Sequence, residues 1–103
     1  MKKLKSLPAD TYQIAVAVAR SYNELLKRQG KLSQEQESRN TQKIKAVEEA
    51  LAEMADDTER ELVRRNLIGG VNMEHIPLPM SLRTMKRARK KFLWILAKKL
   101  NEA

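Results

Sequence analysis

Residues 81–100 read SLRTMKRARKKFLWILAKKL, and this stretch decides the expected fold. Its apolar side chains recur every three or four positions, which places them on one face of a helix turning by about 100° per residue. They are Met85, Ala88, Phe92, Ile95, Leu96 and Leu100. A face of this kind leaves water only by packing against other helices, so the segment predicts a helical bundle. Ser81 is a good N-terminal cap for the helix.

The opposite face of the same helix is strongly basic within about two and a half turns. Its cations are Arg83, Lys86, Arg87 and Lys90. Residues 81–103 hold eight Lys/Arg against one Glu, whereas residues 32–80 hold six against ten acids. The chain carries a formal charge of +8, and this distribution concentrates the positive field at one element, as a polyanion-binding protein requires.

Upstream, we expect one uninterrupted helix from a Ser6 cap to Gln29, ended by Gly30. Its apolar stripe would be Ile14, Val18, Tyr22, Leu25 and Leu26. Residues 31–41 are polar and are interpreted either as a loop or as the solvated start of the next helix, with Asn40 or Thr41 as the favoured cap.

A second apolar stripe has an a/d spacing that predicts a helix able to pack against another helix. It consists of Ile44, Val47, Leu51 and Met54. The next helix would start at an Asp57 or Thr58 cap and end at Gly69-Gly70. Its apolar side would be Leu62, Val63, Leu67 and Ile68.

A short helix at 72–76 and a turn through Pro77 and Pro79 lead into the basic helix. No run of alternating polar and apolar residues predicts a sheet. The expected fold is therefore all-α, a bundle of four or five helices with a C-terminal helix-turn-helix. We divide the chain into 1–41, an N-terminal helix and polar connector suited to dimerisation, and 42–103, the helix-turn-helix domain.

Composition excludes several classes of protein. The 103 residues include no cysteine and one histidine, so thiolate sites and paired histidine ligands are excluded, and we expect no metal, no cofactor and no enzyme activity. His75 is interpreted as a surface or cap residue, and the acids between 56 and 61 as helix-start residues. No apolar run has the length of a signal peptide or a membrane span, so we expect a cytoplasmic protein.

The order of elements from about residue 57 also resembles a known family. The matching segments are 59–63 (ERELV), 80–87 (MSLRTMKR), 90–93 (KKFL) and 96–100 (LAKKL), with a weaker match at 43–48. They are similar to the RinA/ArpU-type late-gene transcriptional activators of phages of Gram-positive bacteria, which in turn resemble the promoter-reading region of sigma factors. The likeness covers roughly residues 42–103.

The resemblance implies a transcription regulator in a bacterial cytoplasm that binds duplex DNA and activates late genes, and it allows contact with host RNA polymerase. It makes Arg83, Thr84, Lys86 and Arg87 the groove-facing residues and Ser81 the cap. By chemistry, arginine forks onto guanine, lysines such as Lys86 and Lys90 suit phosphates, and the Ser81 and Thr84 hydroxyls add phosphate donors. Two prolines before the helix depart from a regular helix-turn-helix.

Other interpretations of the basic helix remain open. It could be a solvated face, a helix lying on anionic lipid with Phe92 and Trp94 inserted, or an RNA-binding surface. A small helical module that binds RNA polymerase or another regulator without specific DNA contact is the main alternative function. One recognition helix reads few base pairs, so the DNA-binding interpretation predicts a homodimer through the N-terminal helix or the 44/47/51/54 stripe.

Overall fold

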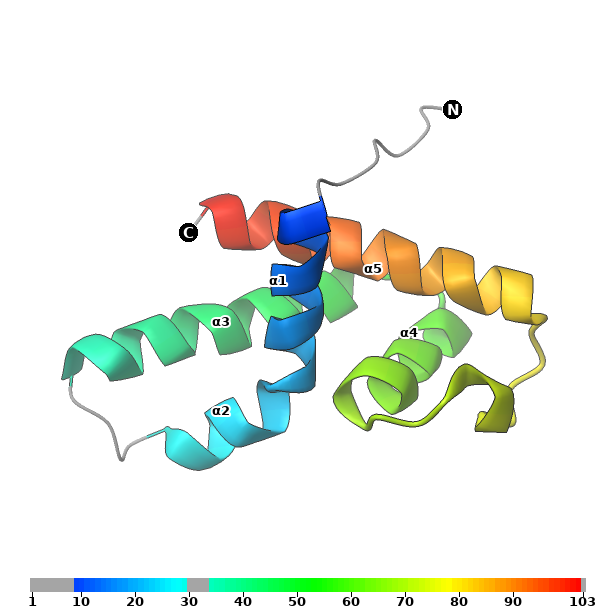
Figure 1. Ribbon diagram of the computed structural model, residues 1–103, viewed down its shortest axis with the longest axis horizontal. Helices are drawn as coiled ribbons and strands as arrows, with labels where there is room; N and C mark the ends of the chain where they lie inside the picture. The colour runs from blue at the N-terminus through cyan, green and yellow to red at the C-terminus, as the bar shows by residue number, and fades with distance from the viewer. Residues whose placement is uncertain (1–8, 30–33, 103) are drawn as a thin grey trace.

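The computed structural model describes residues 9–29 and 34–102, and within them it is an all-α bundle, as expected. The described part contains five α-helices: α1 (Ala9–Arg20), α2 (Tyr22–Arg28), α3 (Gln34–Glu53), α4 (Asp57–Val63) and α5 (Leu82–Glu102) (Figure 1). A π-helical turn, η1 (Arg64–Ile68), continues α4, and a single 3-10 turn, η2 (Met73–His75), precedes α5. The expected Ser6 cap and Gly30 stop lie outside the described residues.

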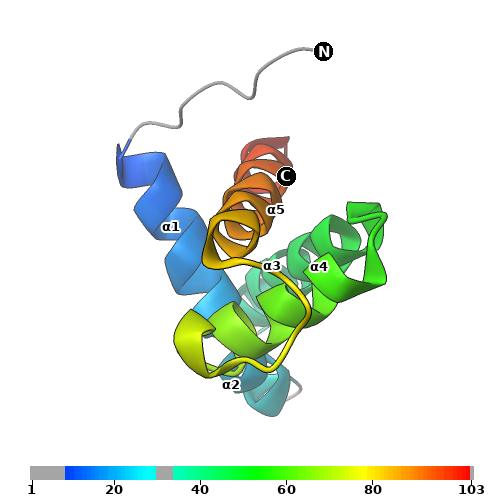
Figure 2. The same ribbon diagram turned by 90° about the vertical axis from the view of Figure 1, so that its right-hand side faces the viewer.

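Helix α5 is the central element of the bundle and contacts α1, α3 and α4. Figure 1 shows α3 running beneath α5 with α1 crossing both, and in Figure 2 α1 and α4 lie on opposite sides of α5. The apolar face predicted for α5 is confirmed, since Met85, Ala88, Phe92 and Leu96 are buried. Ile95 and Leu100 pack at the edge of the core. These buried residues form the apolar seam of α5 (Met85, Ala88, Phe92 and Leu96), and the seam determines which side of the helix faces the solvent.

One hydrophobic core joins the N-terminal and C-terminal halves of the chain. Its largest fully buried side chains are Phe92, Met54, Leu62, Leu67, Leu93, Leu96, Val47 and Val63. Ala15, Val18 and Ala19 of α1 belong to the same cluster. Residues before and after position 41 are therefore packed together in one globule.

The expectation of one unbroken N-terminal helix is wrong, because the chain bends at Ser21 between α1 and α2. The Ser21 hydroxyl donates to the Ala17 carbonyl oxygen at 2.7 Å, a bond four residues back that competes with the helical ladder and bends helices. The predicted stripe is wrong in part: Val18 and Leu25 are buried, but Ile14 and Leu26 are 59% and 41% exposed.

The reason for the rotated face of α1 lies in its small residues. Ala15, Val18 and Ala19 have the i, i+3, i+4 spacing of one helix face, and two of the three carry only a methyl group. This face lies against the core with α5 and η1 as neighbours, and Ile14 is left facing water. The small side chains of Ala15 and Ala19 allow α1 to pack closely against its neighbours, and the larger Ile14 is therefore left on the exposed side.

Helix α3 begins at Gln34, so the cap expected at Asn40 or Thr41 is wrong, and from Gln34 on this stretch is the start of the helix and not a loop, with Ser38, Arg39 and Thr41 exposed. From Gln34 on the sequence holds no Gly or Pro before the core stripe and is rich in Gln and Glu, which favour helix. The stripe Ile44, Val47, Leu51 and Met54 is buried as predicted.

Helix α4 is capped by Asp56 and not by Asp57 or Thr58 as expected. The chain is extended at Asp56, and Oδ1 of Asp56 accepts from the backbone N–H of Thr58 at 2.8 Å and of Glu59 at 3.2 Å. An N-cap carboxylate reaches the second and third helical N–H groups, which places the cap one residue earlier. The expected stop is confirmed, with Gly70 in the left-handed conformation at φ +71°.

The segment between η2 and α5 makes two tight turns, in which the backbone N–H of Leu78 donates to the Ile76 carbonyl at 2.9 Å and that of Met80 donates to the Leu78 carbonyl at 2.8 Å. The short helix predicted at 72–76 is reduced to the turn Met73–His75, because a residue before proline, here Ile76, avoids the helical conformation. Ile76 is buried, and Leu78 and Met80 pack against the core two and four residues later. These three contacts at alternate positions hold the connection before α5 against the core.

Candidate nucleic-acid interface

The six residues predicted to bind DNA lie on the exposed N-terminal part of α5 or just before it. Ser81, Arg83, Thr84, Lys86, Arg87 and Lys90 are all exposed. In the same two turns Met85 is 3% exposed and Ala88 fully buried. The buried pair fixes the rotation of the helix, so the four cations form one outward surface, hereafter the basic face (Arg83, Lys86, Arg87 and Lys90).

The basic face is not neutralised by acids of the described residues, and several of those acids pair with other cations. Asp57 accepts from the guanidinium of Arg60 within α4, and Glu61 of α4 accepts from Nε of Arg65 in η1 at 2.7 Å. No described carboxylate lies within 4.0 Å of a basic-face cation. The four charges are therefore free to meet an external anion.

The C-terminal half of α5 uses its charge differently. Lys99 Nζ lies 2.6 Å from Glu53 Oε2 and 3.6 Å from Glu49 Oε2, so it ties α5 to α3. The hydrogen bond from Lys99 to Glu53 raises the pKa of Lys99, and burial opposes that shift. Lys98 lies over the Trp94 ring, 5.5 Å from its centroid. Lys98 and Lys99 therefore use their charges in contacts within the protein, unlike the cations of the basic face.

The N-terminus of α5 carries two hydroxyl groups that share one hydrogen bond. Ser81 Oγ accepts from the Thr84 backbone N–H at 3.2 Å, which confirms Ser81 as the cap, and lies 3.0 Å from Thr84 Oγ1. One hydroxyl donates to the other, so the pair keeps one hydrogen with no partner among the described residues. That hydrogen, beside the helix dipole, suits a phosphate oxygen.

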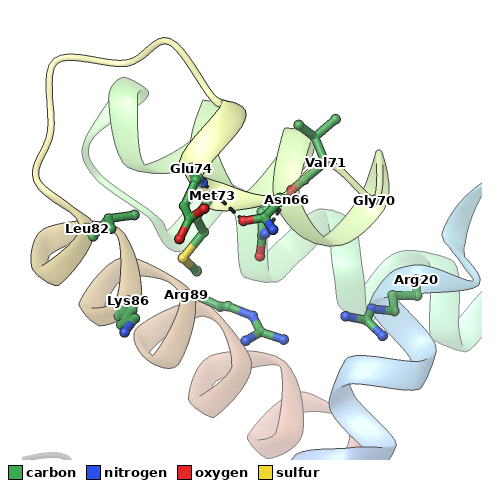
Figure 3. A pocket seen from close by; sticks show the side chains of 10 residues that line it. Arg20, Asn66, Gly70, Val71, Met73, Glu74, Leu82, Lys86 and Arg89 are labelled. Carbon is green, nitrogen blue, oxygen red and sulfur yellow. Dashed lines mark hydrogen bonds between the residues drawn. The ribbon is translucent and has the colours of Figure 1, made fainter.

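The structure also brings together residues that the sequence did not single out. Arg20 of α1 joins Lys86 and Arg89 of α5 around an open pocket of about 670 Å³ (Figure 3). The rest of its wall comes from η1 and the chain after it, from η2 and from the start of α5: Asn66, Gly70, Val71, Asn72, Met73, Glu74 and Leu82. We call it the flank pocket, since it lies along one flank of the basic face.

Arg89 had a signal in the sequence, because it follows Lys86 by three residues and shares that flank of the helix. Arg20 had none, since only the crossing of α1 over α5 brings it to the pocket. The Asn66 amide donates to the Val71 carbonyl at 2.9 Å and holds the wall after Gly70 in place.

Two other interpretations of the sequence can be placed. Phe92 is fully buried and Trp94 half-buried, so Phe92 is not available to enter a lipid surface. His75 is exposed in η2, and the part of the chain that the structure describes holds no group of three or more His, Cys, Asp or Glu able to bind a metal ion.

Among the described residues, none of the helices combines the length and the apolar character needed to cross a membrane. Comparison of the chain with protein-family models, with curated proteins and with solved structures finds no match.

Proposed function

We propose that this protein binds double-stranded DNA through the basic face of α5 and regulates transcription. The observation that carries the proposal is the presentation of Arg83, Lys86, Arg87 and Lys90 to solvent on a helix whose other side is locked into the core. A rigid, exposed helix of this kind fits the major groove, which admits one α-helix.

Chemistry assigns different roles to the four cations. Arg83 and Arg87 lie four residues apart on one face and have the planar fork that matches O6 and N7 of guanine. Lys86 and Lys90, also four apart, are compact charges that suit phosphates on the groove edge. The free hydrogen of the Ser81 and Thr84 pair adds one donor near the N-terminus.

The connection of two tight turns between η2 and α5 supports a variant of the helix-turn-helix. Its first helix is reduced to the turn η2, and the buried Ile76 holds that turn to the core in place of a longer helix. The resemblance to RinA/ArpU-type activators extends the proposal to a phage or prophage regulator of late genes that acts as a homodimer in a bacterial cytoplasm.

Selection of bound sequences from a random duplex pool tests this function. We expect a recurring motif containing guanine, since arginine forks are the base-reading groups on the face. Recovery of unenriched pools, with no affinity above background, would contradict DNA recognition and leave the protein-interaction module as the function.

Arg87→Ala tests the base-reading role directly. Loss of a fork onto a base costs about 1–3 kcal/mol on the selected motif and relaxes the preference at one position. Arg28→Ala is the matched control, because it removes the same charge from an exposed position on α2, away from the basic face. Equal binding of selected and scrambled duplexes by the parent and by Arg87→Ala would show that Arg87 reads no base.

A further inference from the structure

The flank pocket holds more positive charge than its own acids can balance. Arg20, Lys86 and Arg89 line it together with a single carboxylate, that of Glu74. Glu74 is exposed, and its printed hydrogen bond uses only its backbone N–H, which donates to Asn72 Oδ1 at 3.1 Å. The pocket therefore keeps a net charge of about +2 when all four groups are ionised.

The cations of this pocket have no acidic partner within the described residues. None of the ion pairs among them involves Arg20, Lys86 or Arg89. Nε of Arg89 is buried and has no hydrogen-bond partner, although a buried N–H donor without a partner costs free energy. Figure 3 shows the guanidinium groups of Arg20 and Arg89 pointing toward one another across the pocket.

Two guanidinium groups that face each other repel unless an anion lies between them. A phosphate group has several charged oxygens at the spacing of the guanidinium N–H groups, so it can accept from both forks, while Lys86 adds a point charge. The pocket is open and far larger than one phosphate, so the group can enter as part of a larger molecule.

We propose that Arg20, Lys86 and Arg89 form a binding site for one phosphate group. Lys86 belongs both to this site and to the basic face, so the phosphate lies at the edge of the surface that we assign to DNA. Two sources share this chemistry, a phosphate of the duplex backbone and a free phosphate compound. The site itself stands on its own residues, and only the backbone source rests on the proposed function.

Titration with inorganic phosphate, followed by the backbone N–H NMR signals of Gly70, Val71 and Glu74 in the pocket wall, tests the site. Sodium chloride at equal ionic strength serves as the reference. We expect a saturable shift in the parent protein and about tenfold or greater weakening in Arg20→Gln and in Arg89→Gln, because each removes a charge-assisted donor. Arg20 is exposed, so Arg20→Gln keeps the fold even if Arg89→Gln does not. Arg28→Gln, with the same charge change on α2, should bind phosphate as the parent does.

Duplex binding by the same variants distinguishes the two sources. If the phosphate is that of the backbone, Arg20→Gln lowers the slope of log K against log salt by up to about 0.9, the contribution of one phosphate. If the source is a free phosphate compound, inorganic phosphate still binds to the site, and Arg20→Gln leaves the salt slope of duplex binding unchanged. Phosphate binding by the parent protein supports the site even if the protein binds no duplex. A phosphate shift that never saturates, or that is the same in Arg20→Gln and Arg89→Gln as in Arg28→Gln, overturns the site.

Discussion

Replacement of Phe92 by alanine should destabilise the whole bundle, since this side chain lies where α5 meets the core. Phe92 has no exposed surface and is the largest of the fully buried side chains. Truncation of a buried phenylalanine to alanine costs about 3–5 kcal/mol, the sum of lost transfer free energy and the cavity left behind. A domain of this size has about 5–15 kcal/mol in total, so much of its stability would be lost.

Thermal unfolding followed by far-ultraviolet circular dichroism measures the effect. With about 4–8 °C of Tm per kcal/mol for a domain of roughly this length, Phe92→Ala should lower Tm by at least about 12 °C. Ile14→Ala is the control: it also shortens an apolar side chain, but Ile14 is 59% exposed, and its cost should stay within about 0.5 kcal/mol.

The comparison of these two variants tests the helix phase on which the basic face depends. If Phe92→Ala melted at the parent temperature while Ile14→Ala did not, α5 would present a different side to the core. The assignment of Arg83 and Arg87 to the solvent side would then be refuted together with the seam.

Three further perturbations have distinct outcomes. Met85→Asp puts an unpaired charge at a position 3% exposed, which costs several kcal/mol, and a cooperative melt at the parent temperature would show that Met85 is not buried. Asp56→Ala removes the cap of α4 and should cost about 1 kcal/mol in urea unfolding, whereas no change would place the cap elsewhere. Burial, and then the charge of Glu48, raise the pKa of Tyr22 above its usual value near 10, and Arg64 opposes that shift. The neutral Tyr22 hydroxyl therefore contributes stability that is complete below pH 10 and is lost as pH rises through the folded-state pKa. Tyr22→Phe should remove that part of the alkaline loss of stability, and an unchanged pH profile would contradict it.

Periodicity predicted the elements that are long and strongly patterned. The seam of α5 and the stripe of α3 could be predicted because large apolar residues at helical spacing lie on one face, and that face is buried in the core. The cap at Ser81 and the stop at Gly70 followed from backbone chemistry alone. The exposure of the basic face followed from the seam, since the opposite side of the same helix must face water.

The features that sequence could not supply depend on tertiary packing. Ile14 was expected to be buried, but the small side chains of Ala15 and Ala19 suit the contact with α5 better. The bend at Ser21 comes from a hydroxyl bond that an isolated pattern does not reveal. Arg20 reaches the flank pocket only because α1 crosses α5, 66 positions before Lys86 in the chain.

The salt dependence of duplex binding tests the central claim most directly. If the four cations of the basic face each neutralise one phosphate, log K should fall with log salt at a slope of about −3.6, that is about −0.9 per phosphate. A variant with Arg83, Lys86, Arg87 and Lys90 all changed to glutamine should lose most of that slope while keeping the parent melting temperature, because none of the four is buried. A slope near zero for the parent, or the same slope in both proteins, would contradict the account.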